Sequence, residues 1–285
     1  MWSAIFSLLA KKREGRIRSL VEMEGNTILQ ARNISFGYEK SLVLKNIAFT
    51  IRGGDFVAII GPNGSGKTTL LKIILGTLSP MEGDVLLDGK PVLSYAAKER
   101  AKKISYVSQE PIFTFPLTVL ELVSLGRYVH SNRFKQRPED GQAVEDALRQ
   151  TDSFNLRERK LTTLSGGERQ KVLIARTLAQ TSHLLLMDEP TVHLDIYFQL
   201  QILNSLKELC REKKSTIVAV LHDLNLISLF ADKALLLKSG KCLAFGKVEE
   251  VLNESSIKEA FGVEVAIRKE AESETLYFFP RRPLP

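Results

Sequence analysis

Apolar and polar residues alternate in two stretches near the start of the chain, Thr27–Phe36 and Val43–Ile51. Alternation with a period of two is typical of strands that bury one face, so both are predicted to be half-buried antiparallel strands. The next segment differs, because apolar residues follow one another without a break in Asp55–Ile60. Such a run is typical of a strand buried on both faces, and it predicts a parallel sheet covered by helices.

Helices are predicted where apolar residues recur with the period of an α-helix. Lys67–Leu75 has this spacing after a glycine-rich turn, and Ser165–Gln180 has it after a Ser-Gly-Gly turn. The stretch at about 111–164 is polar and helical, is broken at Pro116 and Pro138, and contains no strand-like run. We interpret this middle stretch as a helical insertion into an α/β core.

Further strands are predicted in the second half of the chain. His183–Met187 and Thr216–Leu221 are short apolar runs, typical of buried strands. Ala234–Lys238 and Lys241–Phe245 are separated by Ser239-Gly240, which predicts a hairpin. Buried strands that alternate with helices indicate the α/β class.

The length and composition fit one large domain with a smaller subdomain. The chain has 285 residues, of which 44% are hydrophobic, and can bury a substantial core. We expect the domain to cover residues 25–265 and to include a short terminal helix at Ile257–Phe261. Residues 1–24 are expected to form an N-terminal extension. Residues 266–285 are expected to form a C-terminal tail whose last segment, Pro-Arg-Arg-Pro-Leu-Pro, is loose.

The N-terminal extension has a short apolar stretch followed by basic residues, the reverse of the order in a secretory signal. It is either an amphipathic tail on a membrane surface or a dispensable extension. We favour the second, because Met23 lies just before the first strand and could be the true start. No apolar run approaches the roughly 20 residues that cross a bilayer.

The charge of the chain is moderately basic, with 40 Lys and Arg against 33 Asp and Glu and a net charge of +7. These basic residues are scattered apart from a few short clusters, so no nucleic-acid partner is expected. A basic face near an anionic membrane leaflet is a second interpretation. Cys210 and Cys242 lie far apart and outside any CxxC motif, which indicates reduced thiols rather than a disulfide or a metal site.

A phosphate-binding loop is predicted between the buried strand and the first helix. It fits the pattern G-x-x-x-x-G-K-[ST] with Gly61, Pro62, Asn63, Gly64, Ser65, Gly66, Lys67 and Thr68. Glycines let successive backbone N–H groups point at phosphate oxygens, and the helix N-terminus adds the positive end of its dipole. Lys67 can reach the β and γ phosphates of ATP, the Thr68 hydroxyl can ligate Mg²⁺, and Thr69 can contact the α phosphate.

Two acidic residues follow the buried strand Leu184–Met187, and such a pair is on its own as consistent with a capping turn as with a site. Together with the phosphate loop, the pair predicts catalysis, since ligands bind at the carboxyl ends of parallel strands. Asp188 is placed to hold the Mg²⁺ shell. Glu189 is placed to activate the attacking water as a general base.

The segment Leu164–Gln170, with sequence Leu-Ser-Gly-Gly-Glu-Arg-Gln, resembles the signature motif of the ABC transporter ATPases. The resemblance covers about residues 27–261 and implies the ABC ATPase fold, a P-loop core with an antiparallel β subdomain and an inserted helical subdomain. It also implies that Ser165, Gly166, Gly167 and Glu168 bind ATP held by the P-loop of a second copy, so that two copies dock head to tail.

Other residues match motifs of this family. Tyr38 is similar to the aromatic residue that stacks on adenine. An aromatic ring can stack on any base, because each base has a π-face. Gln109 matches the glutamine that senses Mg²⁺ and water, and Asp195 matches the aspartate at the dimer interface. His222 follows a strand and matches the histidine that contacts the γ phosphate. The three other histidines are not expected to be catalytic.

The resemblance narrows further to the ATPases that import iron–siderophore complexes, haem or cobalamin. It rests on Phe115–Tyr128, Thr191–Ile196 and His222–Asn225, while Val192-His193 departs from many relatives. It implies an ATP-hydrolysing translocase subunit at the cytoplasmic face of a membrane, bound to polytopic permease subunits around Phe113–Arg127. A periplasmic or lipid-anchored substrate-binding protein is an indirect partner. The alternatives are an importer of another cargo and a soluble ABC ATPase without a permease.

Overall fold

The computed structural model describes residues 27–39, 41–108, 116–130, 138–212, 215–270 and 275–281. The N-terminal extension at residues 1–24 and Gln109 lie outside the described residues. Within the described ranges, no helix has both the length and the apolar character needed to cross a membrane.

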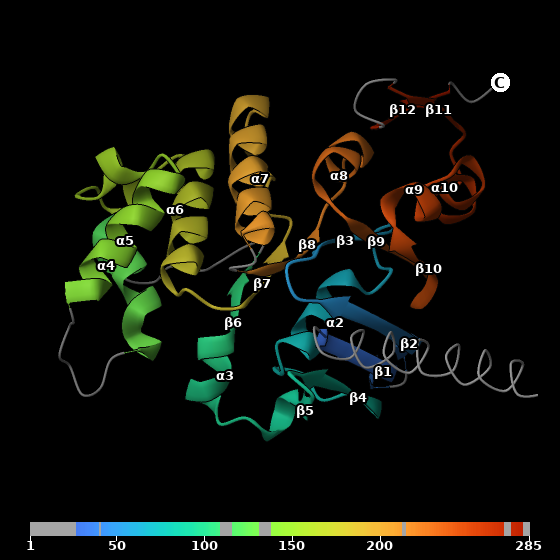
Figure 1. The fold of residues 1–285 in the computed structure, drawn as a ribbon, viewed down its shortest axis with the longest axis horizontal. Coiled ribbons are helices and arrows are strands. Elements are labelled where there is room, and N and C mark those ends of the chain that lie inside the picture. The colour runs from blue at the N-terminus through green and yellow to red at the C-terminus, as the bar shows by residue number, and fades with distance from the viewer. Residues whose placement is uncertain are drawn as a thin grey trace, which may run out of the picture.

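An antiparallel sheet forms the lower part of the molecule in the view of Figure 1. Its strand order is β2-β1-β4-β5, with β1 at Thr27–Tyr38, β2 at Ser41–Arg52, β4 at Glu82–Leu87 and β5 at Lys90–Pro91. Strands β1 and β2 pair antiparallel and are each partly exposed, with burial that alternates over most of β2, which confirms the two half-buried antiparallel strands predicted from the sequence.

The central sheet has the order β10-β9-β3-β8-β7-β6. Its strands are β3 (Phe56–Ile60), β6 (Ile104–Val107), β7 (Leu184–Asp188), β8 (Thr216–Val220), β9 (Lys233–Lys238) and β10 (Lys241–Lys247). All of these run parallel to their neighbours except β10, which pairs antiparallel with β9 in the predicted hairpin. Every residue of β3, β7 and β8 is buried, as the unbroken apolar runs predict.

Helices cover both faces of the central sheet (Figure 1). Helix α2, Lys67–Ile74, lies between the two sheets, and its buried residues share one apolar cluster with Val57 and Ile59 of β3. The alternate residues of β3, among them Phe56 and Ala58, belong to the second cluster. The two faces of one strand thus serve two cores, because successive side chains point to opposite sides. The other helices on this core are α3 (Ala97–Lys103), α7 (Ile196–Arg211), α8 (Leu224–Phe230), α9 (Val248–Val251) and α10 (Glu254–Phe261).

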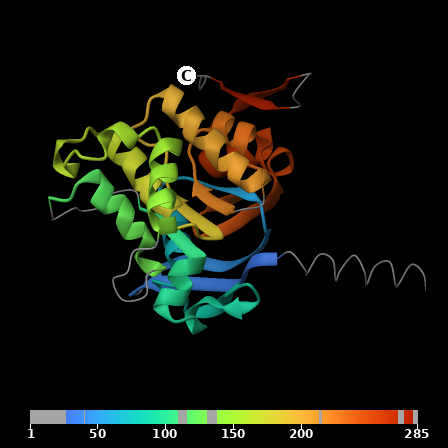
Figure 2. The same ribbon diagram turned by 60° about the vertical axis from the view of Figure 1, so that its left-hand side comes forward.

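The predicted helical insertion forms a separate group of helices at one side of the molecule, as Figures 1 and 2 both show. It contains α4 (Val119–Leu125) and α5 (Pro138–Gln150), which pack on α6 (Gly166–Ala179). Thr118 begins α4 with a capping box, since its hydroxyl accepts from the N–H of Glu121 and the Glu121 carboxylate accepts from the Thr118 N–H. The described part of this stretch confirms the helical prediction.

A hairpin near the C-terminus was not predicted. Strands β11 (Val265–Lys269) and β12 (Leu276–Pro280) pair antiparallel and lie above α8 and α10 in Figure 1. The sequence predicts a tail at residues 266–285 and no strand there. The physical cause is a long-range contact, because Phe278 is buried in one core cluster with Leu226 and Ile227 of α8 and bonds to Asn225, 53 positions earlier in the sequence.

Candidate active site

A loop rich in left-handed glycines joins β3 to α2. Gly61, Gly64 and Gly66 have φ angles of 154°, 76° and 99°, which glycine adopts without a steric cost. A Cβ on Gly61 would lie 2.2 Å from the carbonyl oxygen of Leu237, and one on Gly66 would lie 2.5 Å from Cδ2 of Leu44. The loop is therefore packed between β9 and β2 at a distance that leaves no room for a side chain. A loop of this kind, followed by a helix N-terminus, suits the anion-binding role that the sequence predicts for it.

Lys67 is the first residue of α2, and its side chain is buried. Its Nζ donates to the carbonyl oxygens of Gly61, at 2.9 Å, and of Pro62, at 3.1 Å. Burial lowers the pKa of the ammonium, and the nearby carboxylates of Glu189 and Asp188 oppose that shift. The positive charge of Lys67 therefore lies beside the loop whose backbone groups are predicted to surround the phosphates.

Asp188 ends β7 and is only 1% exposed. The Tyr106 hydroxyl donates to its Oδ2 at 3.4 Å, whereas Oδ1 is buried and has no hydrogen-bond partner among the described residues. Burial raises the pKa of this carboxyl, and hydrogen bonds from Thr68 and Tyr106 lower it only in part. A buried carboxylate oxygen without a partner, next to the Thr68 hydroxyl, fits the all-oxygen ligand set that Mg²⁺ prefers.

Glu189 and His222 follow two neighbouring strands and contact each other. Oε1 of Glu189 lies 2.7 Å from Nε2 of His222. Glu189 has a φ of 54°, a left-handed conformation that costs a non-glycine residue about 1–3 kcal/mol. Strained backbone of this kind is typical of active sites, where the surrounding structure holds a side chain in the position that the chemistry needs.

Most of these groups line one cleft of about 660 Å³, although Gly61 and Asp188 are not among its lining residues. The lining residues come from β2, the glycine loop, α2 and the ends of β7 and β8, and they are Val43, Asn63, Gly64, Gly66, Lys67, Thr68, Thr69, Glu189 and His222. The volume lies within the range of small-molecule sites. Most of the residues predicted to act on the phosphates are therefore brought together.

Tyr38, predicted to stack on adenine, ends β1 and is 49% exposed. Its ring packs edge-on against Phe36, with 5.0 Å between ring centroids. It pairs with Ser41 at the turn into β2, the strand that contributes Val43 to the cleft. Tyr38 is not among the described residues that line the cleft, so its contact with adenine stays a prediction.

Ser165–Glu168, the predicted signature segment, begins α6. The Ser165 hydroxyl accepts from the N–H of Glu168 at 3.2 Å, and the Ser165 N–H donates to the Glu168 carboxylate at 2.8 Å. Arg159 also contacts Glu168, at 2.8 Å, and these bonds lower the pKa of Glu168, chiefly the one from the Ser165 backbone. None of the four residues lines the cleft described above. The start of α6 at Gly166 and Gly167 thus lies apart from the glycine loop, and its contact with a phosphate stays a prediction.

Asp195 also begins a helix, because its carboxylate accepts from the N–H of Phe198 at 3.0 Å and caps α7. The loop before it lies against the signature segment. A Cβ on Gly167 would be 3.2 Å from the carbonyl oxygen of His193 and 3.7 Å from Cδ2 of Leu194. Asp195 therefore has a structural role in this chain, in addition to the interface role that the sequence predicts.

Val43, which lines the cleft, and Tyr106, which donates to Asp188, are not predicted as site residues. The sequence pattern places Val43 only in a half-buried strand and gives no signal for Tyr106. The proximity of Tyr106 to Asp188 follows from the parallel pairing of β6 with β7, which sets Val107 opposite Met187. Strand order cannot be derived from one sequence, so no local signal identified this contact.

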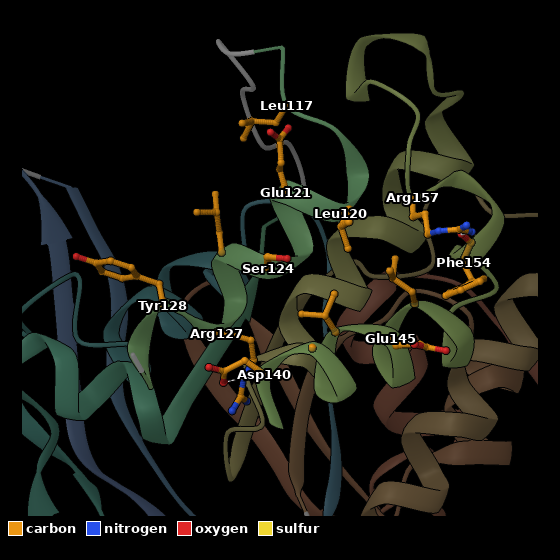
Figure 3. A pocket seen from close by; sticks show the side chains of 14 residues that line it. Leu117, Leu120, Glu121, Ser124, Arg127, Tyr128, Asp140, Glu145, Phe154 and Arg157 are labelled. Carbon is orange, nitrogen blue, oxygen red and sulfur yellow. Dashed lines mark hydrogen bonds and ion pairs between the residues drawn. The ribbon is translucent and has the colours of Figure 1, made fainter. Parts of the chain in front are cut away.

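A larger groove of about 940 Å³ lies in the helical insertion, between α4 and α5 (Figure 3). Leu120, Leu125 and Tyr128 at this groove are exposed apolar residues. The side chains of Arg127 and Asp140 point toward each other below them and form an ion pair of 2.8 Å. The groove overlaps the predicted permease contact at Phe113–Arg127, although Phe113 lies outside the described residues.

Comparisons with known proteins identify relatives of this chain. Residues 44–192 match the family model described as ABC transporter. The ferric enterobactin transport ATP-binding protein of Escherichia coli (strain K12) is 41% identical over 240 residues, which cover 84% of this chain and 89% of that protein. A petrobactin import ATP-binding protein of Bacillus anthracis is 38% identical over 256 residues, covering 90% of this chain and 93% of the relative.

Solved structures show the same fold. A metal-chelate type ABC transporter in an inward-facing conformation has a chain with a TM-score of 0.77 and 32% identity, covering 90% of this chain and 98% of that one. A dimeric ATP-binding cassette in a post-hydrolysis state, bound to ADP and Pi, has a TM-score of 0.70 and 31% identity, covering 78% of this chain and 99% of its own.

Proposed function

Since this chain belongs to the ABC transporter family and is an ATPase of that family, we propose that it powers import of a metal chelate through a separate permease. The metal chelate is an iron–siderophore complex, haem or cobalamin. Relatives named for ferric enterobactin, petrobactin and hemin transport support this cargo class. An importer of another cargo and a soluble ATPase without a permease are the alternatives.

The contact between Glu189 and His222 carries the hydrolytic part of the proposal. Glu189 takes a proton from the attacking water, and His222 holds the carboxylate in position and contacts the γ phosphate. Lys67 and the loop of Gly61, Pro62, Asn63, Gly64, Ser65 and Gly66 bind the phosphates, with Thr69 at the α phosphate. Electrostatic stabilisation by positioned donors is the main source of catalysis in such reactions.

A magnesium ion completes this arrangement, with Asp188, Thr68 and Gln109 as the proposed ligands or ligand-positioning residues. When bound, Mg²⁺ neutralises charge that develops between the β and γ phosphates. The unpartnered Oδ1 of Asp188 supports the assignment. Tyr38 is the proposed adenine-stacking residue.

Dimerisation follows from the separation of the two predicted phosphate-binding segments. Ser165, Gly166, Gly167 and Glu168 do not line the cleft that contains their own chain's P-loop. We assign them to ATP bound by a second copy, with Asp195 in the same interface, in a head-to-tail dimer. ATP binding closes this dimer, and hydrolysis with phosphate release reopens it.

The groove between α4 and α5 is the proposed contact with the permease, which would hold the chain at the cytoplasmic face of the membrane as a peripheral subunit. Its exposed apolar rim suits the apolar face of a short helix. A substrate-binding protein, periplasmic or lipid-anchored, delivers the cargo to the permease.

The test is reconstitution of the chain with a metal-chelate permease and its substrate-binding protein. We expect ATP-dependent uptake of a ferric siderophore, haem or cobalamin into vesicles, abolished by Glu189→Gln. Uptake of an unrelated solute would favour the first alternative. Absence of any polytopic partner during purification would favour the soluble ATPase.

A further inference from the structure

The C-terminal hairpin is attached to α8 by side chains of α8 itself. The N–H of Phe278 in β12 donates to Oδ1 of Asn225 at 2.8 Å, and Nδ2 of Asn225 donates to the carbonyl oxygen of Phe278 at 3.5 Å. The amide of Asn225 thus pairs with both polar groups of one strand residue, as a neighbouring strand would. A turn further along α8, the Ser228 hydroxyl accepts from the N–H of Leu276 at 3.0 Å.

Apolar packing accompanies these hydrogen bonds. The Phe278 side chain is 4% exposed and belongs to the same core cluster as Leu226 and Ile227 of α8. Figure 1 shows the hairpin beside α8 at the edge of the molecule. The hairpin is therefore part of the packed structure around α8.

Helix α8 begins directly after the imidazole of the active site. Its N-cap is Asp223, whose carboxylate accepts from the N–H groups of Asn225, at 2.8 Å, and Leu226, at 3.2 Å. His222 precedes that cap, and its side chain is 44% exposed. The position of His222 against Glu189 therefore depends on where α8 begins.

We propose that the hairpin β11–β12 is a positioning element for His222, and that Asn225 is the positioning residue that connects them. This rests on the proposed catalytic role of His222 in the cleft. Asn225 and Ser228 fix α8 from the side away from the sheet, and the cap at Asp223 transmits that position to His222. In the sequence, His222–Asn225 is recognised only by its resemblance to the family. The structure gives Asn225 a physical role.

The experiment measures ATP hydrolysis at steady state for Asn225→Ala and Ser228→Ala. Asn225→Ala removes both bonds to Phe278 and leaves the buried N–H without its acceptor. We expect kcat to fall about three- to tenfold, with KM for ATP changed less than about twofold, because α8 does not line the phosphate cleft. Ser228→Ala removes one bond and should have the same effect to a smaller degree.

The matched control is Asn253→Ala, which removes an amide that caps α10 and lies outside both α8 and the hairpin. A general loss of stability would lower the activity of both variants. The decisive measurement places Asn225→Ala in a His222→Ala background under single-turnover conditions, which register slow hydrolysis. If Asn225 acts through His222, the second substitution has no further effect.

Hydrogen exchange of the backbone at residues 222–230 gives an independent reading. Faster exchange there in Asn225→Ala, but not in Asn253→Ala, supports the proposal. An unchanged kcat, multiplicative losses in the His222→Ala background, or exchange that rises only in β12 would overturn it. A normal kcat for His222→Ala alone would instead contradict the proposed function on which the inference rests.

Discussion

Glu189 and His222 reach each other from adjacent strands, with 2.7 Å between Oε1 and Nε2. The strands that precede them, β7 and β8, pair in parallel so that Asp188 lies opposite Val220. The carboxyl ends of parallel strands meet at one edge of a sheet, so an acid after one and an imidazole after the next lie side by side. In this position Glu189 adopts a left-handed φ of 54°.

Replacing Glu189 by glutamine keeps the shape of the side chain and removes its ability to accept a proton. We expect ATP binding to be retained, turnover to fall by about 10²–10⁴, and a closed ATP-bound dimer to accumulate. Turnover and size-exclusion chromatography with ATP measure both effects. Glu208→Gln, at an exposed position on α7, is the control and should behave as the parent. Normal turnover in Glu189→Gln would remove Glu189 as the general base.

Replacing Lys67 by alanine removes the ammonium that spans Gly61 and Pro62. We expect the affinity for ATP to fall about 10- to 100-fold, since hydrogen bonds to charged groups are the stronger kind. Binding of a fluorescent ATP analogue measures this. Lys72→Ala, on the same helix but not among the residues that line the cleft, should bind as the parent. Equal affinity of the two variants would contradict the phosphate-loop assignment.

The parts of this site that could be predicted from the sequence are those that depend on residues close together in the chain. The glycine loop and Lys67 follow from a buried strand that leads into a helix, and Asp188, Glu189 and His222 follow from their places at strand ends. The attachment of Phe278 to Asn225 depends on a contact across 53 positions of sequence, which no periodicity records. The strained φ of Glu189 is likewise invisible in the sequence, because glutamate has no preference for that conformation.

Asp188 should make the nucleotide-free protein less stable, because burial raises the pKa of its carboxyl. A carboxyl whose pKa is higher in the folded than in the unfolded protein lowers the free energy of unfolding when the pH is above the folded-state pKa. This loss of stability disappears when the pH is below the pKa of the unfolded chain. Asp188→Asn should therefore raise Tm at neutral pH, by about 2–4 °C for each kcal/mol gained. The difference should shrink as the pH falls toward the ordinary aspartate value of 3.8.

Thermal unfolding across this pH range, without nucleotide or magnesium, measures the effect. Asp223→Asn is a suitable control, since Asp223 is exposed and caps a helix, so its loss should not stabilise the protein. A lower Tm for Asp188→Asn at neutral pH would show that its charge is compensated by Lys67 in the free protein. With Mg²⁺ and ATP present, the order should reverse, because only the carboxylate binds the cation strongly.

The signature segment should act on the partner's nucleotide, which a mixture of two inactive variants can test. Lys67→Ala has a defective P-loop, and Ser165→Arg has a defective signature. In a mixed dimer, one site combines the intact P-loop of one copy with the intact signature of the other. We expect hydrolysis to reappear on mixing, at up to about a quarter of the parent value for random pairing.

If the signature served its own chain, the mixture would stay inactive. The control for damage to the helix cap is Thr118→Arg, since Thr118 begins α4 with the same type of capping box as Ser165 begins α6. Each substitution removes a cap worth about 1 kcal/mol. Only the Ser165 variant should lose hydrolysis, whereas equal losses in both would attribute the effect to folding.

The groove between α4 and α5 should be needed for attachment to the membrane partner. Leu120→Asp places a charge on its exposed apolar rim, where Leu120 is 38% exposed. We expect co-purification with the permease to fall by about tenfold or more, because burying an unpaired carboxylate is costly. Leu93→Asp is the control, since Leu93 is 47% exposed and lies outside the groove. Retained co-purification in Leu120→Asp, with ATP affinity unchanged in both variants, would exclude this groove as the docking surface.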